Sequence, residues 1–178
     1  MNARIQEQRP VTVIEPGSVR LERLLPGPVE RVWAYLTESD KRAKWLAAGE
    51  FDLRVGGKAV LSWDNASLPN AGPAPSEYQG RGVGRFEGVI TRLEPQRVLA
   101  HTWPKNGADM EVTYELSPRG KDVLLTIVHR RVPKEMVSGA MGGWDVHSGI
   151  LEDLLRGVEP RSFWKTHMKL EKEYAAAL

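Results

Sequence analysis

Apolar and polar residues alternate along much of the chain, and this alternation predicts strands. The clearest case is residues 110–116, where Met110, Val112, Tyr114 and Leu116 are separated by polar residues. Further strand-like segments are residues 18–25, 51–55, 58–63, 79–93, 98–103 and 122–131. Most of the turns between these segments are short, so we expect the strands to pair as an antiparallel meander.

A different spacing, with apolar residues three to four positions apart, predicts a long helix over residues 136–155. One face of this helix carries Trp144, His147, Ile150, Leu151, Leu154 and Leu155. The opposite face carries Asp145, Ser148, Glu152, Asp153 and Arg156. These polar residues, Asp145 included, are expected to be solvated, and Gly157 and Pro160 are expected to end the helix.

Shorter helices are predicted on both sides of the strands. Residues 28–37 and 40–47 form two short helices after the first strand. Residues 162–178 form a further helix with one apolar stripe of Phe163, His167, Leu170, Tyr174 and Leu178. A helix of this length is marginal alone in water, so it must pack on something. We expect it to fold back on its own domain, with a second copy in a dimer as the alternative.

The order of elements predicts an α+β helix-grip fold. A curved antiparallel sheet of about six to seven strands wraps the long C-terminal helix, and two short helices follow the first strand. The domain covers residues 18–157. Residues 1–17 are a polar N-terminal tail or an added edge segment, and residues 158–178 hold the extra helix. Residues 64–78 form a long, proline-rich loop that we expect to be a mobile rim or lid.

The composition excludes several classes of protein. A length of 178 residues suits one domain with a substantial core. The absence of cysteine excludes disulfides, thiol nucleophiles and thiolate metal sites, and agrees with a cytoplasmic location. The net charge of +2 includes no block of Lys or Arg, so nucleic-acid binding is not expected. We expect neither a secretory signal nor a membrane span, because no apolar run is long enough.

Several short strings recur in a recognisable order along residues 19–156. They are Pro28–Trp33 with Leu36-Thr37, Trp45, Gly56-Gly57, Gly88-Val89-Ile90 with Leu93-Glu94-Pro95, Thr102-Trp103, Val112–Leu116, Leu125-Thr126 with His129, and Gly143-Trp144 with Leu151. In this order the chain resembles the START-like helix-grip superfamily, also called SRPBCC or polyketide-cyclase-like. Within it, the chain is similar to the branch named for the activator of the ATPase of the 90-kDa heat-shock chaperone. The resemblance implies the fold and a link to stress response, but supplies no universal active site.

The histidines are the main candidates for chemistry. His101, His129, His147 and His167 do not have the spacing of metal ligands, so we expect no metal site and no cofactor. His147 lies in the apolar stripe of the long helix, which favours packing or orientation of a ligand over catalysis. No nucleophile elbow, phosphate loop or dinucleotide fingerprint is present. We therefore predict no catalytic residue.

The aromatic residues point to a cavity instead. A helix laid across a strongly curved sheet leaves space at one end, and small ligands bind in apolar pockets with a few polar groups. The predicted ligand-binding residues are Trp45, Trp63, Tyr78, His101, Trp103, Tyr114, Met141, Trp144, His147 and Leu151.

These observations favour a non-enzymatic domain that binds a small hydrophobic or amphipathic ligand between the sheet and the long helix. The first alternative is a co-chaperone or other protein-interaction module, which would need a surface patch outside the cavity. The second is a cyclase- or hydrolase-like enzyme with His147 or His101 as its base, which would need a perturbed group facing the cavity. The sequence is compatible with a monomer or a homodimer.

Overall fold

The computed structural model describes residues 9–105 and 107–178. The strands are β1 Val11–Glu15, β2 Ser18–Pro26, β3 Lys58–Asp64, β4 Val83–Glu94, β5 Val98–Lys105, β6 Ala108–Arg119 and β7 Asp122–Arg130. The helices are α1 Val29–Thr37, α2 Ser39–Arg42, α3 Val137–Arg156 and α4 Phe163–Ala177. Short 3-10 turns are η1 Asn65–Ser67, η2 Ser76–Tyr78 and η3 Lys134–Met136.

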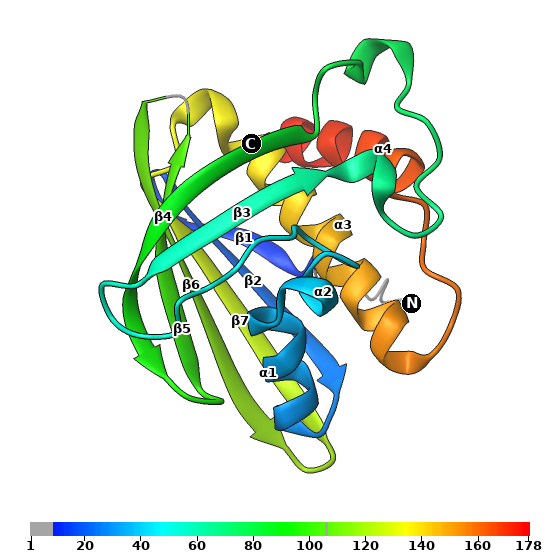
Figure 1. Cartoon of the computed structure of the whole chain (residues 1–178). Helices are drawn as coiled ribbons and strands as arrows, with labels where there is room; N and C mark the ends of the chain where they lie inside the picture. Colours follow the sequence, from blue (N-terminus) through cyan, green and yellow to red (C-terminus); the bar gives the residue numbers. More distant parts are fainter. Residues whose placement is uncertain (1–8, 106) are drawn as a thin grey trace, which may run out of the picture.

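The strands form one antiparallel sheet of seven strands in the order β1-β2-β7-β6-β5-β4-β3. The sheet curves around α3, which lies across its concave face, while α4 lies beside α3 (Figure 1). The predicted α+β helix-grip fold is confirmed, including the long C-terminal helix in the grip of the sheet.

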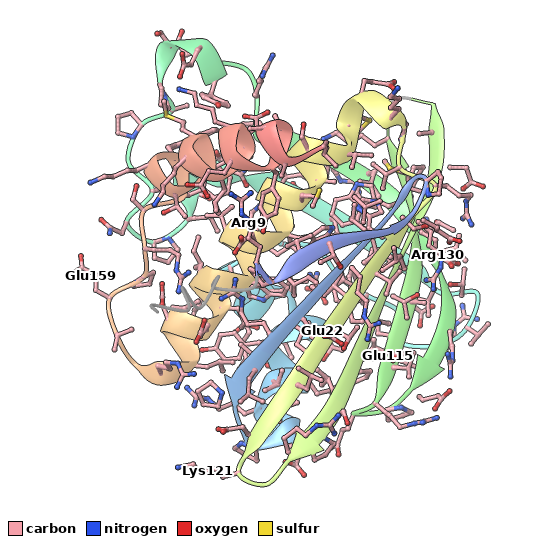
Figure 2. The ribbon with its side chains drawn as sticks, turned by 180° about the vertical axis from the view of Figure 1, so that it is seen from behind. Arg9, Glu22, Glu115, Lys121, Arg130 and Glu159 are labelled. Atoms are coloured by element: carbon pink, nitrogen blue, oxygen red, sulfur yellow. The ribbon has the colours of Figure 1, made fainter. Side chains whose placement is uncertain are left out.

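The two faces of the sheet follow the alternation in the sequence. Val19, Leu21 and Leu25 of β2 face the concave side and are buried. Glu22, Glu115 and Arg130 stand on the convex side, which no described helix covers (Figure 2). The register places Val19, His129, Val112, His101 and Ile90 in one buried row across five strands. A histidine on β5 and another on β7 therefore face the same interior.

Two predicted segments differ from the structure at the edges of the sheet. Residues 11–15, within the segment called a tail or added edge, form edge strand β1 beside β2. Residues 1–8 lie outside the described residues. Residues 51–55 are not a strand, because only Phe51 makes an isolated bridge, to Ala59. Residues 52–55 are exposed, so their alternation has no face to bury.

The second short helix is also shorter than predicted, ending at Arg42 instead of near residue 47. The Arg42 guanidinium is buried and donates hydrogen bonds to the carbonyl oxygens of Leu36, Thr37, Ala47 and Gly49. The chain therefore wraps around this cation, and its carbonyl groups are drawn toward Arg42. Burial lowers the pKa of Arg42 to about 10.

The polar face of α3 was expected in solvent, and that prediction is wrong for Asp145 and Ser148, which are buried. Arg23 of β2 lies on the concave side of the sheet and donates to Asp145 Oδ1 at 2.7 Å and to Glu152 Oε2 at 2.9 Å. Tyr174 of α4 donates its hydroxyl to Asp145 Oδ2 at 2.7 Å. Asp145 therefore joins β2, α3 and α4 through one carboxylate.

Helix α4 packs against α3 of its own domain. Phe163, Trp164 and Tyr174 are buried in the common core. The two helices approach closely at Gly142, where an added Cβ would lie 3.3 Å from the backbone nitrogen of Glu171. No helix among the described residues is long and apolar enough to cross a membrane.

Replacing Asp145 with Ala should cost about 3 kcal/mol in the free energy of unfolding. The change leaves the Arg23 guanidinium with one carboxylate fewer and removes the acceptor of the Tyr174 hydroxyl. Urea unfolding measures the loss. Glu22→Ala is the control. Glu22 pairs with Arg20 on the exposed face of β2, the strand that also carries Arg23, so this substitution should cost under about 1 kcal/mol. Equal losses in the two variants would contradict the anchoring role of Asp145.

Candidate functional site

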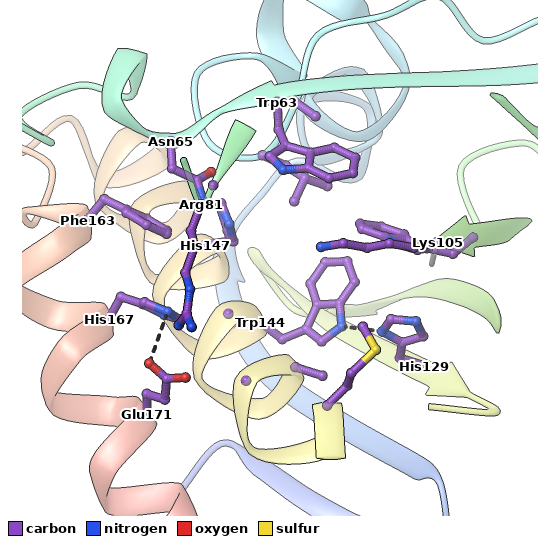
Figure 3. A pocket seen from close by; sticks show the side chains of 18 of the residues that line it. Trp63, Asn65, Arg81, Lys105, His129, Trp144, His147, Phe163, His167 and Glu171 are labelled. Atoms are coloured by element: carbon purple, nitrogen blue, oxygen red, sulfur yellow. Dashed lines mark hydrogen bonds and ion pairs between the residues drawn. The ribbon is translucent and has the colours of Figure 1, made fainter. Parts of the chain in front are cut away.

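A cavity of about 310 Å³ lies between the N-terminal half of α3, α4 and the ends of β3, β5 and β7 (Figure 3). Its wall is mostly apolar, and side chains from the loop after β3 complete it. The size lies at the lower end of the range for small-molecule sites. The position matches the expectation that a curved sheet under a helix leaves space at one end.

Three tryptophans form the wall on the side of the sheet and α3. The rings of Trp63 and Trp103 stack with centroids 6.1 Å apart, and Trp144 meets Trp103 edge-on at 5.6 Å. Trp63 lies against the backbone of Gly84, where an added Cβ would come within 2.5 Å of the indole. A glycine at this position of β4 is therefore required for the aromatic wall. The contact with Trp63 explains one of the glycines within residues 79–93, the segment predicted as a strand.

Helix α4 and the loop supply the facing wall. Phe163, Trp164, His167 and Glu171 recur at helical spacing along α4 and line the cavity. The Tyr78 hydroxyl donates to Glu171 Oε2 at 2.8 Å and ties the loop to the helix. Burial, together with that carboxylate, raises the pKa of Tyr78 to about 12.

The predicted binding residues divide into two groups. Trp63, Tyr78, Trp103, Trp144 and His147 line the cavity. Trp45, His101, Tyr114, Met141 and Leu151 are buried in the surrounding core and do not line it. The spacing of apolar residues identified both groups as inward-facing, but it does not show where along α3 the space opens. The part that these residues play in binding stays a prediction.

His101 is enclosed on all sides. Its Nδ1 lies 2.9 Å from the carbonyl oxygen of Thr102, and its Nε2 lies 3.3 Å from the Tyr114 hydroxyl. The ring of Trp103 stacks on it at 6.0 Å. Burial lowers the pKa of His101 to about 4. Both ring nitrogens are therefore held by the protein, and neither is presented to the cavity.

The other two buried histidines line the cavity with fixed tautomers. Trp144 Nε1 donates to His129 Nδ1 at 3.1 Å, and because indole is only a donor, the proton of neutral His129 must lie on Nε2. His147 Nδ1 lies 2.6 Å from the carbonyl oxygen of Trp45, which is only an acceptor. His147 Nε2 is therefore an acceptor. Burial lowers the pKa of His129 to about 3 and that of His147 to about 4, so both are neutral at physiological pH.

Four buried side-chain atoms have no hydrogen-bond partner among the described residues, and all four belong to residues that line this cavity. They are Asn65 Oδ1, His129 Nε2, Trp164 Nε1 and His167 Nδ1. Buried polar atoms without a partner are rare in proteins and costly, and they concentrate at functional sites. The unsatisfied groups therefore concentrate in the residues around the cavity, although the four atoms themselves are covered.

Two cations also reach the cavity. Lys105 Nζ lies 5.1 Å from the ring centroid of Trp63, and the guanidinium of Arg81 lies 5.9 Å from that of Tyr78. Burial lowers the pKa of Lys105. No group of three or more metal-ligating side chains occurs in residues 9–105 and 107–178.

The sequence contained a signal for some of the residues that the prediction missed. His129 and Lys105 both fall on the inward positions of their strands, two residues after Ile127 and Trp103 respectively. The α4 residues share one helical stripe, but a stripe alone does not identify the surface that it covers. The loop carries Leu68 and Ala71 as well as Tyr78 in buried positions, more than its composition suggested. Its mobility stays a prediction.

Comparison with known proteins gives the family. The family model described as "Activator of Hsp90 ATPase homolog 1-like protein" matches residues 26–156. A search of curated proteins found no match.

Solved structures share the fold. The protein encoded by gene BPP1335 from Bordetella parapertussis is 38% identical, with a TM-score of 0.78 over 94% of this chain and 89% of that chain. Protein CV1439 from Chromobacterium violaceum is 26% identical, with a TM-score of 0.62 over 83% of this chain and 100% of the other. CalU16 from Micromonospora echinospora is 24% identical, with a TM-score of 0.67 over 93% and 92% of the two chains, and shows the fold alone.

Acidification from pH 6.5 to about pH 5 should destabilise the protein. In the unfolded chain each histidine takes up a proton near pH 6.5, whereas burial keeps His101, His129 and His147 neutral in the fold. The unfolded state therefore binds more protons below pH 6.5. The free energy of unfolding should fall by up to about 1.4 kcal/mol per pH unit for each histidine.

Urea unfolding at several pH values measures this slope. The window lies above the pKa of unfolded carboxyl groups, so it separates the histidines from the acidic residues. The variant His147→Gln should show a shallower slope. A slope of zero in the unmodified chain, or one unchanged by the substitution, would contradict burial of the neutral form.

Proposed function

Since the chain belongs to the family of Activator of Hsp90 ATPase homolog 1-like proteins and has the START-like helix-grip fold, we propose that it binds a small amphipathic ligand. The ligand occupies the cavity between the sheet, α3 and α4. Binding, without chemical conversion, is the activity that we assign to the site.

The observation that carries this proposal is the coincidence of the unpartnered atoms with the cavity. Every residue in the described part of the chain that holds a buried side-chain polar atom without a partner contributes to its lining. A core built for packing alone would satisfy these groups or replace them with apolar ones. A ligand with oxygen or nitrogen atoms would satisfy them once small side-chain shifts uncover them, and it would recover the cost of burial.

The lining also indicates the form of the ligand. Trp63, Trp103 and Trp144 on one side and Phe163 on the other offer ring faces and edges, which suit a flat apolar body. His147 supplies an acceptor, and it keeps this role near neutral pH because burial lowers its pKa to about 4. A molecule with an apolar body and at least one hydrogen-bonding group fits this arrangement.

A protein-interaction module is the second candidate, and one surface feature favours it. Val13 and Ile14 lie on edge strand β1 and are 41% and 48% exposed, respectively. An exposed edge strand with apolar side chains can pair with an extended segment of another protein. This contact would lie outside the cavity, so it does not exclude binding of a small ligand.

Filling the cavity should abolish binding of a neutral ligand. Titration of 2-naphthaleneethanol or 1-decanol into the protein should show one site per chain by calorimetry. Ala140 lines the cavity, and Ala140→Trp places a large ring in it, so the affinity should fall at least about tenfold.

Ala176→Trp is the matched control, because Ala176 is exposed near the end of α4 and away from the lining. Thermal melting should show that both variants remain folded. Unchanged affinity in Ala140→Trp, or an equal loss in both variants, would place the ligand elsewhere and contradict the proposed site.

A further inference from the structure

Two cations, Arg23 and Lys105, occupy inward positions of the sheet, and only one of them is paired with carboxylates. Arg23 follows the inward residues Val19 and Leu21 on β2 and is paired with two carboxylates, Asp145 and Glu152. Lys105 follows the inward residues His101 and Trp103 on β5. No carboxylate of the described residues lies within ion-pair distance of Lys105.

Lys105 is half-buried and lies beside the aromatic wall. Its ammonium group is held over the ring of Trp63, a cation–π contact that partly compensates for lost hydration. The apolar surroundings that lower its pKa make the charge costly, and an anion at this point would remove that cost. No neighbouring carboxylate of the described residues neutralises Lys105, so the cavity can hold one negative charge beside it.

A neutral imidazole lies on the same side. His129 Nε2–H has no partner among the described residues but is itself covered, and its tautomer is fixed by Trp144. The pKa of His129 is lowered by burial first, then by His101, and last by the Lys105 ammonium. Figure 3 shows both residues on one side of the cavity and His167 and Glu171 on the other.

The opposite end of the cavity holds charges of both signs. Glu171 carries the only carboxylate of the described lining, and it already accepts the Tyr78 hydroxyl. Its oxygen Oε2 also lies 3.7 Å from His167 Nε2. The guanidinium of Arg81 lies at the same end, 5.9 Å from the ring centroid of Tyr78. Glu171 therefore has a cation near it, whereas no carboxylate of the described residues lies within ion-pair distance of Lys105.

On the basis of the proposed function, we infer that the ligand is an amphipathic carboxylate whose anionic oxygens are held by Lys105 Nζ. The apolar body lies along Trp63, Trp103 and Trp144 toward α4. A carboxylate matches the ammonium group because its oxygens accept charge-assisted hydrogen bonds.

Matched pairs of ligands that differ only in the head group test this inference. The pairs are 2-naphthaleneacetate with 2-naphthaleneethanol, and decanoate with 1-decanol, titrated at pH 7.5 by calorimetry. We expect the acid of each pair to bind about tenfold more tightly than its alcohol, the effect of one charge-assisted contact. Lys105→Met should abolish this preference, because the affinity for the acid falls about tenfold relative to that for the alcohol.

Two further variants complete the test. Lys105→Arg keeps the charge and should keep the preference for the acid. Lys121→Met removes a lysine from the β6–β7 hairpin, far from the cavity, and should change neither affinity (Figure 2).

The possible outcomes separate the two proposals. Equal binding of acid and alcohol, or a preference that survives in Lys105→Met, would overturn the anionic head group and leave the proposed function in place. If no member of either pair binds, both the inference and the proposed function fail.

Discussion

One buried carboxylate, that of Asp145, holds together the parts of the molecule on which everything else depends. It receives the Arg23 guanidinium from the sheet and the Tyr174 hydroxyl from α4, while its own helix lies between them. An unpaired charge in this position would be very costly, so the arrangement is stable only when all partners are present. The docking of α4 is thereby coupled to the grip of the sheet on α3.

The cavity is a consequence of that docking. Without α4 the aromatic wall of the sheet would face solvent, because Phe163, Trp164 and His167 form the opposite side. Two polar groups around it, the imidazoles of His129 and His147, are neutral, and their hydrogens are fixed by a donor-only and an acceptor-only partner. Such fixed groups reorganise little when a ligand binds, which is the usual basis of selective binding in preorganised sites.

Local pattern was sufficient to predict the fold and much of the inward-facing set of residues. Alternation along β6 and β7 fixed the faces of the sheet, and the spacing along α3 fixed the residues that it buries. The same alternation along β2 and β5 places Arg23 and Lys105 at inward positions, although a charged residue on a strand is usually interpreted as solvated. Failure came where the outcome depends on distant parts of the chain. Asp145 lies on the polar face of its helix, and only the return of α4 makes that face buried.

Residues 51–55 show the same limit of local pattern, here for a strand that was predicted but does not form. Their alternation is that of a strand, but β3 already has β4 as a partner on one edge, and its other edge makes only isolated bridges. The position of the cavity along α3 could not be predicted from local pattern either. It is set by how far the loop and α4 extend over the end of the sheet, which is a property of the assembled fold.

The family match ends at residue 156, whereas α4 begins at Phe163. One wall of the cavity is thus encoded by a short stretch of sequence after the shared domain, and the other wall by the shared domain itself. Substitutions in α4 therefore reshape one wall of the cavity without altering the sheet or its central helix. On the proposed function, chimeras that exchange only α4 between relatives should exchange selectivity, provided that the acceptor for the Tyr174 hydroxyl is retained.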